Sequence, residues 1–150
     1  MARYELGVTT PAAAAGAAYL DIRTGANDRV SILEFGMFTT AATATSFGLI
    51  RPATIGTAST SQAAVSGDAA TPNATSATVI GTAWSAAATI SGTPAYLRRM
   101  TAAGNIGSGA IFTWPLYGLT VPVSSSLLVW NFGAAAGAAC SAYVVFEEIR

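Results

Sequence analysis

The segment Arg29–Phe38, RVSILEFGMF, carries the clearest strand pattern in the chain. Alternate residues of a strand point to opposite sides of a sheet. One side would carry Val30, Ile32, Glu34, Gly36 and Phe38, and the other Ser31, Leu33, Phe35 and Met37. Both sides are largely apolar, which predicts a central strand covered by a core on one side and by a subunit interface or a neighbouring segment on the other. We therefore expect Phe35 and Met37 in contacts between subunits.

Glu34 is a carboxylate on a mostly apolar face of this strand. An isolated charge in such a place is costly, so the sequence predicts an ion pair that fixes the register of the strand. The candidate partners are Arg51, Arg98 and Arg99. A catalytic role is not indicated, because no second acid, histidine or lysine accompanies Glu34.

Outward from this strand, the segments with bulky residues are short and separated by Gly, Pro, Asn or Ser, which is typical of an all-β fold. The alanine runs favour helix by propensity, but no window keeps bulky apolar residues at a spacing of 3.6. The expected strands are Arg3–Val8, Ala18–Arg23, Arg29–Phe38, Thr45–Arg51, Thr78–Trp84, Ala95–Thr101, Gly109–Trp114, Leu119–Val123, Ser126–Phe132 and Ser141–Ile149.

The stretch around 52–94 is dominated by small residues and is expected to be a long loop around one short strand. Within it, Thr57–Ala77 is interpreted as an arm that becomes ordered on a neighbour. Residues 1–16 are expected to form an N-terminal arm or an added strand, and 17–150 a single domain. In the last strand, Glu147 and Glu148 are expected where the strand emerges into solvent.

The chain carries few charges for its size. Charged residues make up 9% of its 150 residues, whereas about 25% is usual in soluble proteins. A compact monomer of this mass exposes about 7,000 Å², which leaves about one charge per 500 Å². Ala, Gly, Ser and Thr supply just over half of the sequence. We infer that much of the surface is covered by copies of the chain or by a larger assembly.

Several functions are not indicated by this composition. With a net charge of zero and no lysine, the chain lacks the basic surface that nucleic-acid binding requires. With no histidine and one cysteine, Cys140, it lacks the ligands of common metal sites and the residues of thiol–imidazole catalysis. Cys140 is expected to be a buried, inert thiol. We expect no catalytic residues, no cofactor and no metal, hence no enzyme.

A membrane span is the competing explanation for low charge. The window Leu127–Phe146 is uncharged and long enough to span a bilayer. Its bulky residues cluster at both ends around Gly and Ala, and no basic cluster flanks it, so we interpret it as two strands with a short connection. The segment Pro11–Leu20 follows Arg3 and Glu5 rather than a basic region, so an unprocessed cytoplasmic start is expected.

Trp84, Trp114 and Trp130 are large side chains in a chain with little bulk elsewhere. Tryptophan is enriched in cores and at protein interfaces. The sequence therefore predicts all three in packing contacts, with exposure at a subunit interface as the functional interpretation. A platform for binding sugars is the alternative.

The order of the segments LEFGMF, GLIRP, YLRR, FTWPL, LTVPVSSSLLVWN and AYVVFEE resembles jelly-roll proteins of tailed-bacteriophage virions, with decoration (cement) and minor capsid proteins as the nearest class. The resemblance covers most of residues 17–149. It implies a two-sheet β-sandwich of about eight main strands, often trimeric, on the outer capsid surface. It supplies no catalytic residues.

The expected function is accordingly that of a virion structural protein, assembled in the host cytoplasm, that binds the major capsid protein and itself and so stabilises the capsid. A homotrimer is expected. The alternative is a phage tail or fibre component that binds host-surface carbohydrate through exposed aromatic side chains.

Overall fold

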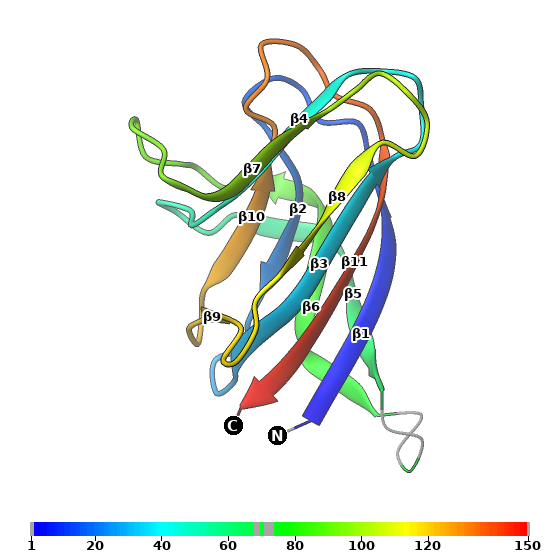
Figure 1. Cartoon of the computed structure of the whole chain (residues 1–150). Coiled ribbons are helices and arrows are strands. Elements are labelled where there is room, and N and C mark those ends of the chain that lie inside the picture. Colours follow the sequence, from blue (N-terminus) through cyan, green and yellow to red (C-terminus); the bar gives the residue numbers. More distant parts are fainter. Residues whose placement is uncertain (1, 68–69, 71–73, 150) are drawn as a thin grey trace.

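The computed structural model describes residues 2–67, 70 and 74–149 and confirms the predicted all-β fold (Figure 1). Those residues contain eleven strands and no helix, and so no helix that could cross a membrane. The strands are β1 (Ala2–Thr10), β2 (Ala18–Arg23), β3 (Arg29–Thr39), β4 (Thr45–Ile50), β5 (Thr57–Ser66), β6 (Thr75–Ala86), β7 (Tyr96–Ala102), β8 (Gly109–Thr113), β9 (Leu119–Val121), β10 (Ser126–Trp130) and β11 (Cys140–Ile149).

The strands form one antiparallel sheet that curls on itself. The strand order is β7-β4-β10-β2-β6-β5-β1-β11-β3-β8, and β9 pairs with β3 beside this path. Two runs of four strands, β7-β4-β10-β2 and β1-β11-β3-β8, are thus linked by the β5–β6 hairpin. In Figure 1 the first run lies to the left and the second to the right.

The core lies between these two runs and holds the large apolar side chains. The ring of Phe47 on β4 lies 6.3 Å from the ring of Phe112 on β8, so side chains from the two runs meet in the interior. Tyr4 on β1 stacks on Phe146 on β11 at 5.8 Å. The largest fully buried side chains are Tyr19, Phe35, Phe47, Phe146, Leu20, Ile22, Ile32, Met37, Leu49, Ile80, Leu127 and Leu128.

A β-bulge at Leu33 decides which residues of β3 reach the core. Ile32 pairs with Phe146 and Glu34 with Val145, so Leu33 is an extra residue without a partner on β11. One extra residue reverses the alternation of the strand. Val30 and Ile32 before the bulge and Phe35 and Met37 after it therefore all join one core.

The expectation that Phe35 and Met37 contact other subunits is therefore wrong. Phe35 is 1% exposed and Met37 is 0% exposed, and both lie among the core side chains of the subunit itself. Strict alternation along the strand predicts Phe35 and Met37 on the side opposite Val30 and Ile32. The bulge at Leu33 reverses the alternation, so all four side chains point into the same core.

The expected long loop around 52–94 is also wrong, because it contains the β5–β6 hairpin. Strand β5 pairs with β6 between Thr57 and Val65, and β6 pairs in turn with β2. The arm expected at Thr57–Ala77 is therefore a strand over its first ten residues, while its residues 68, 69 and 71–73 lie outside the described part. Strand β5 consists mostly of small residues, and of these only Ala64 is buried. The sequence of this strand therefore lacks the alternation of bulky apolar residues from which the other strands were predicted.

The outer side of β4 and β10 is covered by the chain's own connection between β6 and β7. Ala88 and Ile90 from this connection pack with Ile50, Leu128 and Trp130 in a small second core. A backbone pairing of Thr54 with Thr89 holds the covering segment in place. This side of the sheet is therefore filled within the subunit.

The first and last strands pair with each other. Within the segment 1–16, expected as an arm or an added strand, β1 pairs with β11 from Ala2 and Glu148 to Thr10 and Cys140. On its other side β11 pairs with β3 along the whole strand. The start of β1 and the end of β11 therefore lie together at one end of the fold (Figure 1).

Candidate interaction surfaces

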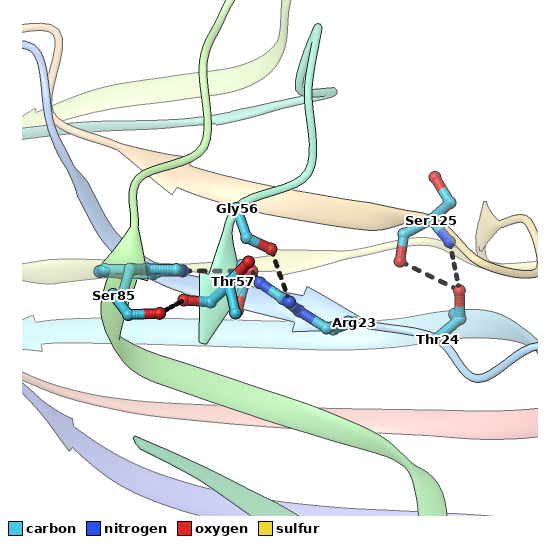
Figure 2. A network of polar contacts seen from close by, with 8 residues as sticks. Arg23, Thr24, Gly56, Thr57, Ser85 and Ser125 are labelled. Atoms are coloured by element: carbon cyan, nitrogen blue, oxygen red, sulfur yellow. Dashed lines mark hydrogen bonds and ion pairs between the residues drawn. The ribbon is translucent and has the colours of Figure 1, made fainter. Parts of the chain in front are cut away.

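A buried ion pair removes one acid and most of one arginine from the surface. Asp21 is 0% exposed, and its Oδ2 accepts a 2.5 Å hydrogen bond from Nη2 of Arg23 and a 3.3 Å hydrogen bond from Nε1 of Trp84. Arg23 Nη1 also donates to the carbonyl of Gly56 at 2.7 Å, beside the contact of Ser85 with Thr57 (Figure 2). These contacts tie β2 to β6 and to the start of β5.

Glu148 is buried as well, which corrects the expectation that the last two glutamates mark the exit of the strand into solvent. It is 3% exposed, and its Oε1 accepts a 2.6 Å hydrogen bond from the backbone N–H of Thr78. Glu147 is partly exposed. The reason is the alternation of β11, which turns Glu148 inward and Glu147 outward.

The ion pair expected for Glu34 is not formed among the described residues. Glu34 Oε1 instead accepts a 2.6 Å hydrogen bond from the hydroxyl of Tyr143 on the neighbouring strand β11. This hydrogen bond, with a smaller effect of burial, raises the pKa of Tyr143 to about 12. The carboxylate thus has a neutral partner close by and stays partly exposed.

The three arginines expected as partners of Glu34 have other contacts. Arg51 Nη2 donates to the carbonyl of Thr120 at 3.0 Å, and Arg98 Nη1 donates to the carbonyl of Leu97 at 3.1 Å. The guanidinium of Arg99 lies 4.5 Å from the ring centre of Phe132. The predicted ion pair is therefore wrong, because the fold does not bring these arginines to Glu34.

The three tryptophans lie in two different places. Trp84, which is partly exposed, and Trp130, which is only 8% exposed, border one pocket of about 340 Å³ whose other walls are mostly alanine. Trp114 borders another hollow, of about 380 Å³, together with Arg3 and Glu34. Trp130 belongs largely to the second core, so its expected role at a subunit interface is reduced to one edge of the pocket.

Cys140 is a buried thiol, as its sequence context predicts. Burial raises its pKa to about 11. The thiolate, which is the nucleophile, is therefore scarce at neutral pH. We expect a thiol reagent such as a disulfide dye to leave Cys140 unmodified in the folded protein at pH 8 and to modify it fully in urea. Rapid modification of the folded protein would contradict the buried position.

A tight turn between β8 and β9 presents two apolar side chains to solvent. Tyr117 N–H donates to the carbonyl of Pro115 at 3.1 Å, and Leu116 between them has a φ of 73°. A γ-turn with positive φ is rare and strained outside glycine. Leu116 is 90% exposed and Tyr117 is 85% exposed. We call Pro115–Tyr117 the apolar tip. It was not predictable from the sequence, because Leu and Tyr next to Pro carry no signal of exposure.

The outer side of β1, β11, β3 and β8, with Val65 of β5 beside it, is here called the open face. Inward residues of these strands join the core, so the alternate residues point outward. Ile111 on β8 is 53% exposed and Val65 is 51% exposed. Two hollows of about 420 and 380 Å³ lie on this face, on either side of Val145. The open face therefore differs from the outer side of β4 and β10, which the chain covers itself.

No family model, curated protein or solved structure matches this chain. Its surfaces are therefore interpreted from their own chemistry. Among the described residues no three of the residue types His, Cys, Asp and Glu come together in a group that could hold a metal ion. What the described surface does carry is the open face and the apolar tip, both suited to contacts with other proteins.

Proposed function

We propose that this chain is a structural subunit of a virion that associates with itself, as a homotrimer, and decorates the outer capsid surface. The fold in this proposal is a jelly roll in which the runs β7-β4-β10-β2 and β1-β11-β3-β8 act as the two sheets of a sandwich. The resemblance to decoration proteins and the all-β architecture support this choice.

The observation that carries the proposal is the open face. The subunit has an accessible surface of 7070 Å², close to the value of about 7,000 Å² for a compact monomer. A standard interface buries about 800 Å² on each partner, or about a tenth of such a surface. The open face offers half-exposed Ile111 and Val65 for this purpose, and apolar burial contributes about 25 cal/mol per Å².

The apolar tip is assigned to the contact with the major capsid protein. The turn closed by the hydrogen bond from Tyr117 to Pro115 presents Leu116 and Tyr117 to solvent, and exposed apolar side chains of this kind can anchor the subunit in an apolar recess. In this proposal the open face joins the subunits and the tip attaches them to the capsid, which makes the particle more resistant to internal pressure.

Self-association is expected to be visible by analytical ultracentrifugation as a species of three times 15.1 kDa. Ile111→Glu on the open face is expected to weaken the association at least about tenfold, because a charge in an apolar interface core is costly. Ile55→Glu is the matched control, since Ile55 is 43% exposed on the connection between β4 and β5. A chain that stays monomeric at high concentration would contradict the proposal.

Binding to purified capsids distinguishes a capsid decoration protein from a tail or fibre component. We expect the wild-type chain to sediment with capsids and the double variant Leu116→Ser, Tyr117→Ser to remain in the supernatant. Binding to a glycan array without binding to capsids would instead favour the tail or fibre component, with the hollow beside Trp114 as the place for the sugar.

A further inference from the structure

Among the described residues, the acids that reach the surface gather on the open face. Glu5 on β1, Glu34 on β3 and Glu147 on β11 point outward from neighbouring strands, while the other acids of the described chain, Asp21, Asp28 and Glu148, are buried. Two arginines share this side: Arg3, which pairs with Glu5 at 3.5 Å, and the exposed Arg29, which lies opposite Ile149 on the outward side of β11. The described part of the open face therefore carries a net negative charge.

Three other arginines lie elsewhere, on the edge of the sheet formed by β7 and the end of β4. Arg98 and Arg99 lie on β7, and Arg51 follows β4; all three are exposed. No ion pair to a carboxylate is formed by any of them among the described residues, whose two ion pairs are Arg3–Glu5 and Arg23–Asp21. We call these three residues the basic edge.

Among the described residues of one subunit, the basic edge forms no ion pair with the outward glutamates. Strand β7 is the first strand in the sheet order, and five strands lie between it and β1. Figure 1 shows β7 on the left and β1 with β11 on the right. The opposite charges that sequence analysis expected to pair, Glu34 with Arg98 or Arg51, are therefore displayed in two directions.

We propose that the basic edge of one subunit docks on the open face of a second copy of this chain, so that Arg98 and its neighbours approach the outward glutamates of the partner copy. This deepens the proposed function and depends on it, because it names the two surfaces of the self-association. The complementary charges select this occupant: a like-charged surface would be repelled, and the second copy carries the matching basic edge.

The contact joins different surfaces on the two copies, so each subunit uses its basic edge once and its open face once. Such head-to-tail contacts close into a ring when the rotation between subunits divides a full turn. Three subunits would complete a trimer with every edge and every face occupied. The half-exposed Ile111 and Val65 then supply apolar burial beside the charges.

The test is charge reversal on each surface, followed by recombination. Arg98→Glu with Arg99→Glu reverses the edge, and Glu5→Arg with Glu147→Arg reverses the face. Each pair is expected to weaken self-association at least about tenfold, because it sets like charges against each other. The chain that carries all four changes is expected to recover, since its acidic edge matches its basic face. Gln62→Glu, an exposed change on β5 outside the open face and the basic edge, is the control.

A smaller set of substitutions reduces the risk that a variant fails to fold. Arg99 packs on Phe132, whereas Arg98 forms a hydrogen bond only with the carbonyl of Leu97, and no hydrogen bond or ion pair of Glu147 is found among the described residues. Arg98→Glu, Glu147→Arg and their combination should therefore follow the same loss and recovery, with circular dichroism as the check on folding. Raising the salt concentration should weaken the wild-type association, because exposed charges are screened over about 8 Å at 0.15 M salt and over about 3 Å at 1 M.

Three outcomes are possible besides the expected one. A monomeric wild type would remove the proposed function together with this contact. Unchanged association of both reversed variants, with Ile111→Glu still disruptive, would overturn the edge-to-face contact alone. Loss in both variants without recovery in the combined chain would also overturn it, since the charges would then not face each other.

Discussion

Phe35→Ala is expected to lower the free energy of unfolding by about 3–5 kcal/mol, whereas Leu33→Ala lowers it by less than about 2 kcal/mol. Phe35 is 1% exposed in the core, and truncating its ring removes apolar burial and leaves a cavity. Leu33 is the extra residue of the β3 bulge and is only partly buried. Urea titrations of both variants measure the difference, with similar m-values indicating an unchanged native state.

Ile32→Ala is the control for this comparison. Ile32 lies before the bulge and is 0% exposed, so its loss is expected to match that of a core residue, about 2–5 kcal/mol. Without the bulge, Leu33 and Phe35 would share one side of the strand and Ile32 the other. Equal losses for Leu33→Ala and Phe35→Ala, with a small loss for Ile32→Ala, would therefore contradict the structure.

Asp21→Ala is expected to cost about 3–5 kcal/mol, because it leaves the guanidinium of Arg23 without its partner in a largely buried place. Trp84 Nε1 loses its acceptor at the same time. Removing both charges, as Asp21→Ala with Arg23→Met, is expected to recover most of the loss, since no unpaired charge remains. Thermal and urea unfolding of the two variants measure this difference.

Glu5→Ala is the matched control for the buried pair. Its ion pair with Arg3 has side chains that are 53% and 57% exposed, and such surface pairs contribute less than about 1 kcal/mol. If Asp21→Ala cost no more than Glu5→Ala, the buried network of Arg23, Asp21 and Trp84 would be shown to contribute little.

The strand positions that depend on bulky residues were predictable from the sequence. The expected strand Ala18–Arg23 coincides with β2, and Ser141–Ile149 differs from β11 by one residue. These segments have side chains that only a core can accommodate, and their boundaries are marked by Gly, Pro or Asn. Strand β5 was missed for the same reason, because a strand of small exposed residues has no pattern of burial to read.

The side to which a residue points was less predictable than the strand itself. A bulge is a property of two paired strands, so Leu33 gives no local sign of it, and the positions of Phe35 and Met37 followed from it. Charge partners are also set by the whole fold. Glu34 accepts a hydrogen bond from the hydroxyl of Tyr143, which is more than a hundred residues away in the sequence. Glu148 accepts one from the backbone N–H of Thr78 on β6.

The sequence shows that the surface carries few charges, but it does not show where the exposed charged and apolar side chains lie. Low charge predicts a surface covered by other subunits, which stays a prediction. It gave no sign that, among the described acids, three are buried and three share one face. The tryptophans drew attention because of their size, whereas the most exposed large apolar side chains in the described part of the chain are Leu116 and Tyr117. Exposure of these two depends on a turn with positive φ, which leucine rarely adopts.

The position of β11 between β1 and β3 has a consequence for biosynthesis. The strands on both sides of it are made first, and each has an unfilled edge until the ribosome has produced β11. Such distant pairing makes folding slow and leaves open edges exposed to other nascent chains. The sheet can therefore be completed only after nearly all of it has been translated, and chaperones that shield these edges should raise the yield of native subunits.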